Sequence, residues 1–164
     1  MLSYQHSYHA GNLADVHKHA ILAVMLDYLT RKDKPLTYIE THSGRGLYRL
    51  DSEEAQKTGE ARQGIGRLAD AFATDHPYGR ALSRVRAAHG ADAYPGSPII
   101  AAQILRPGDR MHLAELHQRE HAALAEAMAG SGADVRRQDG AEMALAITPP
   151  TPRRGLLLID PSYE

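Results

Sequence analysis

Short apolar runs alternate along this chain with longer segments in which apolar residues recur every three or four positions. Four runs have the composition of buried strands, and each ends in polar or glycine residues: 36–41, 110–116, 133–137 and 155–159. Segments of helical period lie between them, at 12–31, 99–105, 117–130 and 139–147. Strands that alternate with helices predict an α/β fold in which a parallel sheet carries helices on both faces.

Residues 51–92 interrupt this alternation, because they are charged, rich in alanine and broken by glycine and proline. They predict short helices at 52–58, 60–72 and 78–89. We expect a helical insertion here, with residues 1–50 and 93–164 forming the sheet domain. Five arginines concentrate positive charge in the insertion: Arg62, Arg67, Arg80, Arg84 and Arg86. Composition alone favours a solvated helical face for them.

The first candidate for chemistry is a strand that ends in two glycines. Residues 37–46 read Thr-Tyr-Ile-Glu-Thr-His-Ser-Gly-Arg-Gly, and a tight turn at Gly44 and Gly46 would let a ligand approach the backbone closely. A dinucleotide-binding fingerprint needs a third glycine where this chain has Arg49, which disfavours a hydride-transfer dehydrogenase. An acid followed by Gly-x-Gly fits S-adenosylmethionine better, and a purely structural turn is the alternative.

Polar residues follow the other strands at the same expected edge of the sheet. Glu115 would accept hydrogen bonds from ribose hydroxyls, and Asp139 would accept one from an adenine amino group. Ser97, before Pro98, is expected to be the N-cap of a helix whose amino end suits a carboxylate. Each residue alone fits a helix cap as well as a ligand contact, and their order along the chain favours the ligand.

The strongest chemical signal is Asp160-Pro161-Ser162-Tyr163, directly after the last strand. It resembles the Asp-Pro-Pro-Tyr motif of amino-methyltransferases that act on exocyclic nitrogens of bases. The Asp160 carboxylate and the Pro161 carbonyl can accept the two hydrogens of an adenine amino group and stabilise positive charge on its nitrogen. Tyr163 would stack on the flipped base. An ordinary Asp-Pro turn is the alternative.

Composition narrows these possibilities. The chain has 164 residues, 43% hydrophobic and 24% charged, which predicts one globular domain without a membrane span. Its net charge of −1 gives no global argument for nucleic-acid binding. Without cysteine it has no disulfides, thiolate nucleophiles or cysteine-bound zinc. Residues 1–12 are polar and contain no signal-peptide core, so we expect a cytoplasmic protein.

Histidines gather near the amino end: His6, His9, His17 and His19. His17 and His19 are two residues apart on the predicted helix and so face different sides. This spacing favours polar or ligand-facing histidines over a metal site.

The opening residues 1–19 and the motifs at 41–46, 94–98, 114–117 and 159–164 together resemble the ribosomal RNA large subunit methyltransferase J (RlmJ) family, from Met1 to Glu164. The resemblance implies a Rossmann-like, S-adenosylmethionine-dependent enzyme that methylates the N6 nitrogen of one adenine in 23S rRNA. It implies cofactor contacts at Lys18, His19, His42, Ser97, Glu115, Asp139 and Gly140. It also implies that Asp160 is catalytic, that Tyr4 contacts RNA and that the arginines of the insertion contact RNA.

The implied partner is 23S rRNA in a protein-free or early assembly form, and we expect a monomer without a metal. Ser162 replaces the second proline of the motif, which predicts weakened rather than absent chemistry. Family members continue well past this motif, so we expect further strands, core and substrate surface to be missing and the flank of strand 155–159 to be exposed. A DNA or small-molecule amino-methyltransferase and a binding module without turnover remain the alternatives.

Overall fold

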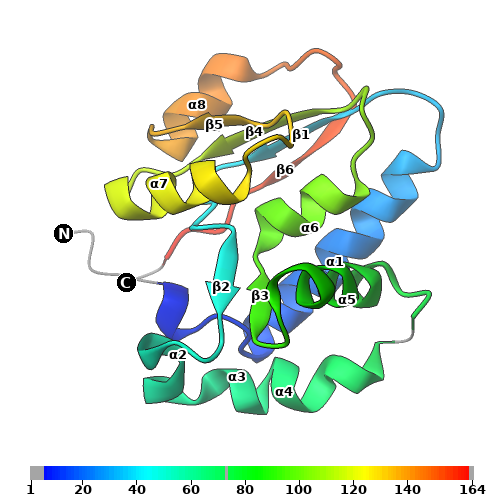
Figure 1. The fold of residues 1–164 in the computed structure, drawn as a ribbon. Coiled ribbons are helices and arrows are strands. Elements are labelled where there is room, and N and C mark those ends of the chain that lie inside the picture. The colour runs from blue at the N-terminus through cyan, green and yellow to red at the C-terminus, as the bar shows by residue number, and fades with distance from the viewer. Residues whose placement is uncertain (1–5, 73, 163–164) are drawn as a thin grey trace.

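The computed structural model describes residues 6–72 and 74–162. Its centre is a four-stranded sheet with the strand order β5-β4-β1-β6 (Figure 1). The strands are β1 (Thr37–Glu40), β4 (Arg110–Ala114), β5 (Asp134–Arg136) and β6 (Gly155–Leu158). Each neighbouring pair is parallel. The predicted parallel sheet is therefore confirmed, with strands that are one to three residues shorter than expected.

Helices cover both faces of the sheet, as predicted (Figure 1). One face packs against α1 (Leu13–Thr30), α6 (Ser97–Ile104) and α7 (Gln118–Ala127), and the other against α8 (Gly140–Ile147). Alternation along β1 explains the two layers, because Tyr38 joins the larger core cluster and Ile39 joins the cluster under α8. All four residues of β1 are buried, as befits a central strand.

Helix α1 begins where the sequence predicts. The Asn12 side chain accepts a hydrogen bond from the backbone N–H of Asp15 at 2.9 Å, which satisfies one of the free amide groups of the first turn. His17 is exposed and His19 is buried, so the two histidines face different sides as expected.

Residues 47–95 leave the sheet domain and return to it through a pair of antiparallel strands, β2 (Leu47–Arg49) and β3 (Ala93–Pro95). This pairing was not predicted, because three-residue strands carry too little alternation to be recognised. The segments between them are α2 (Glu53–Thr58), α3 (Glu60–Gln63), α4 (Ile65–Leu68), the 3-10 helix η2 (Ala69–Ala71) and α5 (Pro77–His89). The assignment of 51–92 to a separate insertion stays a prediction.

The prediction of one continuous helix at 60–72 is wrong, because the chain breaks at Gly64. A Cβ at this position would lie 2.1 Å from the carbonyl oxygen of Gly11. The backbone N–H of Ile65 donates to that same oxygen at 2.8 Å. The helix is therefore interrupted where the insertion docks against the loop that precedes α1.

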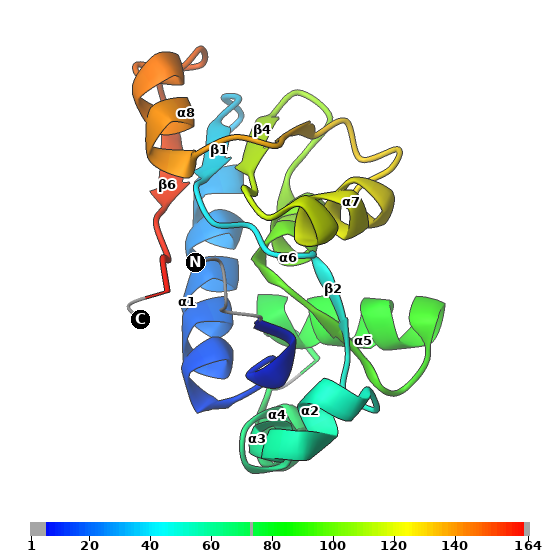
Figure 2. The same cartoon turned by 90° about the vertical axis from the view of Figure 1, so that its left-hand side faces the viewer.

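Strand β6 lies at one edge of the sheet, with α1 beside it (Figure 2). The side chains of Leu157 and Ile159 are 42% and 60% exposed, so the predicted open flank is present in the described structure. Between residues 6 and 162, with residue 73 left aside, no helix combines the length and apolar character needed to cross a bilayer.

Candidate active site

The segments that follow the four parallel strands meet around one cavity of about 740 Å³. Most of the predicted site residues line it: Lys18, His19, His42, Gly44, Ser97, Glu115, Asp139, Gly140, Asp160 and Pro161. Gly46 is not among the lining residues. Tyr4 and Tyr163 lie outside the described residues. The glycine turn and the Asp160 segment therefore share one cavity, although they are more than a hundred residues apart in sequence.

The glycine turn needs glycine at both predicted positions. Gly44 and Gly46 have φ angles of +60° and +77°, which favour glycine. A Cβ on Gly44 would also lie 2.3 Å from the hydroxyl of Tyr48. The carbonyl of Gly46 accepts a 2.7 Å hydrogen bond from the N–H of Gly96. Gly46 thus supports the turn from behind and joins it to the start of α6.

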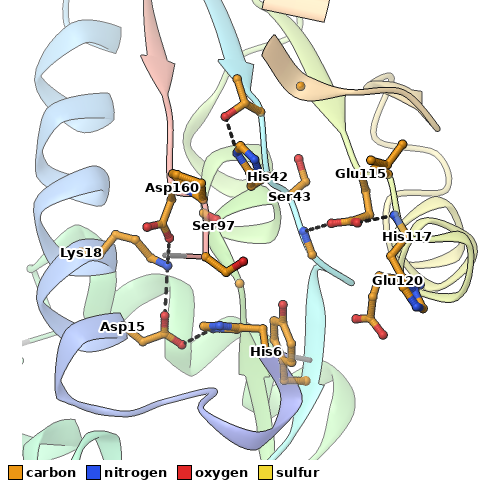
Figure 3. A pocket seen from close by; sticks show the side chains of 18 of the residues that line it. His6, Asp15, Lys18, His42, Ser43, Ser97, Glu115, His117, Glu120 and Asp160 are labelled. Atoms are coloured by element: carbon orange, nitrogen blue, oxygen red, sulfur yellow. Dashed lines mark hydrogen bonds and ion pairs between the residues drawn. The ribbon is translucent and has the colours of Figure 1, made fainter. Parts of the chain in front are cut away.

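Glu115 follows β4 and is held in place by backbone amides. One carboxylate oxygen accepts from the N–H of Gly44 at 2.9 Å, and the other accepts from the N–H of His117 at 2.8 Å (Figure 3). Because each carboxylate oxygen can accept a second hydrogen bond, Glu115 can still receive hydroxyl groups of a ligand.

Asp139 and Gly140 bring α8 against the glycine turn. The Asp139 carboxylate caps this helix by accepting from the N–H of Glu142 at 3.0 Å. A Cβ on Gly140 would lie 2.0 Å from the carbonyl oxygen of Thr41. Only glycine therefore allows the helix to begin this close to the end of β1.

A network of charged side chains forms the opposite side of the cavity (Figure 3). Lys18 donates to Asp160 at 2.6 Å and to Asp15 at 3.0 Å. Asp15 is almost fully buried, and its second oxygen accepts from His6 at 2.8 Å and from the N–H of Gly11 at 3.0 Å. In the described part of the chain, the second oxygen of Asp160 makes no hydrogen bond and is open to a ligand.

These charges stabilise one another against burial. Burial alone would raise the pKa of Asp15, but the facing side chains of His19, His6 and Lys18 hold it well below its usual range. Burial opposes the charge on Lys18, while Asp15 and Asp160 together raise the pKa of its ammonium group. Lys18 therefore stays positively charged and fixes the orientation of the Asp160 carboxylate.

His19 is held by two tyrosines. Its Nδ1 lies 3.0 Å from the hydroxyl of Tyr94, which in turn lies 3.0 Å from the hydroxyl of Tyr78 in α5. Burial lowers the pKa of His19 to about 3, so its imidazole is neutral at physiological pH. If the two hydroxyls donate along the chain toward Nδ1, the Nε2–H of His19 is available to a ligand.

Ser97 lines the cavity, but the prediction that it is an N-cap is wrong. Gly96 is the capping position, and α6 already includes Ser97. The Ser97 hydroxyl donates instead to the carboxylate of Glu40, which also accepts from the hydroxyl of Tyr38 at 2.8 Å. A serine before proline has the pattern of a cap, and sequence alone gives no sign of a partner 57 residues away.

The sequence also missed residues that support the site. Arg45 forms two hydrogen bonds with Glu120, at 2.9 and 2.7 Å, and so ties the glycine turn to α7. Asp15 and His6 had no assigned role, and an aspartate three residues before Lys18 on a helix was the one available signal. Between residues 6 and 162, excepting residue 73, no group of three or more histidine or acidic side chains could hold a metal ion.

A family model described as "Ribosomal RNA large subunit methyltransferase D, RlmJ" matches residues 33–164. The chain belongs to the RlmJ family. Two curated RlmJ proteins, from Escherichia coli (strain K12) and Haemophilus influenzae, are each named "Ribosomal RNA large subunit methyltransferase J" and are 44% identical to the whole of this chain. The family resemblance expected from the motifs is therefore confirmed.

A crystal structure of protein LPL1258 from Legionella pneumophila has the same fold, with a TM-score of 0.85 and 39% identity over 94% of this chain. The alignment covers 58% of that protein. The chain likewise spans about 60% of the length of the two RlmJ relatives.

Proposed function

We propose that this chain forms the cofactor-binding and catalytic part of an S-adenosylmethionine-dependent enzyme that methylates the N6 nitrogen of an adenine in 23S rRNA. The observation that supports this most strongly is the shared cavity of the glycine turn after β1 and the Asp160-Pro161 segment after β6. A methyl donor held by the turn would lie beside a carboxylate with one free oxygen.

The cavity suits S-adenosylmethionine in size and in its polar groups. Its volume of about 740 Å³ lies in the range of small-molecule sites. The buried hydroxyl of Ser43 lines it and has no hydrogen-bond partner among the described residues, so a polar ligand atom would satisfy it. Glu115 would hold the ribose hydroxyls and Asp139 the adenine amino group, while Lys18, His19 and Ser97 would surround the amino-acid end.

When bound, the cofactor supplies a methyl group activated by a positively charged sulfur. The chain's contribution is to orient the adenine amino group that receives it. The free oxygen of Asp160 accepts one amino hydrogen and the Pro161 carbonyl accepts the other, which favours a tetrahedral nitrogen and stabilises its developing positive charge. Lys18 holds the second oxygen of Asp160, so the acceptor geometry exists before the base arrives. Tyr163 would stack on the flipped base.

Recognition of rRNA is assigned to the basic residues of 51–92 and to Tyr4. Arg67 and Arg84 are exposed on α4 and α5, whereas Arg80 is paired with Asp27 at 2.9 Å. The first two are therefore the stronger candidates for phosphate contacts. The protein-free or early assembly form of 23S rRNA, a monomeric state and a cytoplasmic location stay predictions.

Methyl transfer from tritiated S-adenosylmethionine to protein-free 23S rRNA tests the proposal, with duplex DNA as the control substrate. We expect labelled N6-methyladenosine after digestion of the rRNA to nucleosides. Asp160→Asn should lower transfer at least 100-fold, because it weakens the acceptor for the amino hydrogen. Asp51→Asn is the matched control, since Asp51 belongs to an exposed ion pair with Arg49 away from the cavity.

Three results would contradict the proposal in different ways. Transfer to DNA but not to rRNA would assign a different substrate. Cofactor binding without transfer to any substrate would favour the binding module. An unchanged rate for Asp160→Asn would remove Asp160 from the chemistry.

A further inference from the structure

We propose that Glu40, which does not line the cavity, is a positioning residue that holds the Ser97 hydroxyl as a hydrogen-bond acceptor for the amino group at the amino-acid end of the cofactor. This inference rests on the proposed use of S-adenosylmethionine. It assigns a role to a buried acid that the chemistry described above does not use.

Glu40 is a fully buried carboxylate whose only hydrogen-bond partners in the described part of the chain are hydroxyl groups. It ends β1, with 0% of its surface exposed. One oxygen accepts from Tyr38 at 2.8 Å and the other accepts from Ser97. No ion pair reaches it within residues 6–72 and 74–162. A buried carboxylate without a cation is costly, which argues that it is retained for a purpose other than stability.

The number of protons determines what Ser97 can offer to a ligand. A serine hydroxyl has one hydrogen to donate and two lone pairs to accept with. An ionised carboxylate can only accept, so the hydrogen of Ser97 is committed to Glu40. Toward the cavity, which Ser97 lines, the hydroxyl can therefore act only as an acceptor.

An acceptor at this place matches an ammonium group. Ser97 lies near Lys18 and Asp160, on the side of the cavity away from Glu115 (Figure 3). If the ribose is held at Glu115 and the sulfur lies near Asp160, the amino-acid end extends toward Ser97. Its carboxylate can take donors from Lys18 and His19, and its ammonium group needs an acceptor such as Ser97.

Burial raises the pKa of Glu40 to about 7, although the hydrogen bonds from Ser97 and Tyr38 and the charge of Lys18 oppose the change. The nearby charge of Asp160 adds to the rise. Binding measured at pH 8 therefore examines the ionised form, in which the hydrogen of Ser97 is committed.

Calorimetric titration of the 164-residue chain at pH 8 with two ligands tests the inference. S-Adenosylmethionine carries the amino-acid end, and 5′-methylthioadenosine lacks it. Glu40→Gln keeps the shape of the side chain but can place an amide N–H against Ser97, which frees the hydroxyl to donate into the cavity. We expect Glu40→Gln to weaken binding of S-adenosylmethionine roughly 10- to 100-fold and to change binding of 5′-methylthioadenosine less than about twofold.

Two further variants keep the test informative. Ser97→Ala should give the same selective loss, and the double variant should lose no more than either single variant, because both act through one hydroxyl. Tyr38→Phe removes the other hydrogen bond to Glu40, so simple loosening of the buried carboxylate should weaken both ligands equally. Circular dichroism of each variant checks that the fold is retained.

The outcomes separate the inference from the proposed function. Equal losses for both ligands with Glu40→Gln, or no loss for either, would overturn the positioning role while the proposed function stands. Additive losses for Glu40→Gln and Ser97→Ala would overturn it as well. If the unaltered chain bound neither ligand, the proposed function itself would fail, and this inference with it.

Discussion

Replacing Lys18 with methionine tests whether the charged network is a supporting part of the fold. The variant keeps the length and most of the apolar stem of the side chain but removes the ammonium group. Asp15, with 2% of its surface exposed, would then remain buried without its strongest ionic partner. Loss of one partner from a buried pair costs about 3 to 5 kcal/mol, because the other charge stays buried.

We expect a value near the lower end, about 3 kcal/mol. The N–H of Gly11 and the ring of His6 still donate to Asp15. The Lys18 side chain is also 23% exposed, so solvent can partly compensate. Asp160→Asn is the comparison, because the Asp160 side chain is 42% exposed and its half of the network should contribute at most about 1 kcal/mol.

Urea denaturation followed by circular dichroism measures both variants at pH 7. The free energy of unfolding should fall clearly for Lys18→Met and only slightly for Asp160→Asn, with the dependence on urea concentration unchanged. Equal losses for the two variants, or a loss below about 1 kcal/mol for Lys18→Met, would refute the assignment of Lys18 as the counter-ion of a buried Asp15.

Three further predictions address other parts of the molecule. Gly140→Ala should lower the free energy of unfolding by more than about 3 kcal/mol in urea denaturation, because the added Cβ would collide with the carbonyl of Thr41, whereas an unchanged midpoint would contradict that contact. The pKa of Glu40 rises from 4.5 to about 7 on folding, so the folded chain holds a proton that the unfolded chain has released. The wild type should therefore lose roughly 3 kcal/mol relative to Glu40→Gln as pH rises from about 4.5 to 7, and a difference that stays constant with pH would refute this. Replacing Arg67 and Arg84 with alanine should weaken rRNA binding in filter-binding titrations and reduce its salt dependence by up to about two charges, and an unchanged salt dependence would exclude them from the RNA surface.

The sequence was informative where local pattern determines structure. The four parallel strands could be predicted from short apolar runs, and the common edge of the sheet placed Glu115, Asp139 and Asp160 around one cavity. The start of α1 was predicted because an asparagine cap precedes an apolar helical stripe. These features depend on residues within a few positions of one another.

The sequence was uninformative where distant segments determine structure. Helix 60–72 breaks at Gly64 because the loop at Gly11 passes too close for a side chain, and neither residue signals the other in sequence. The hydroxyl of Ser97 turns to Glu40 across 57 positions, and the ion pair of Arg45 spans 75. Such contacts follow from tertiary packing, which overrides the local preference for a serine cap.

The same limit applies to the supporting residues of the site. Asp15 had the sequence pattern of an ordinary acid in a first helical turn, yet it is the buried centre of the network that holds Lys18. Glu40 had the pattern of a ligand contact in the glycine motif, yet it lies behind the cavity. The residues that contact a ligand could thus be predicted more readily than those that orient them.

The central claim is that the donor sulfur is held beside Asp160, and a structure of this chain with S-adenosylhomocysteine tests it most directly. The account predicts that the sulfur faces the Asp160 carboxylate, with the ribose at Glu115 and the adenine near Asp139. A ligand bound outside the cavity, or one with its adenine against Asp160 and its sulfur at the far side, would contradict the claim.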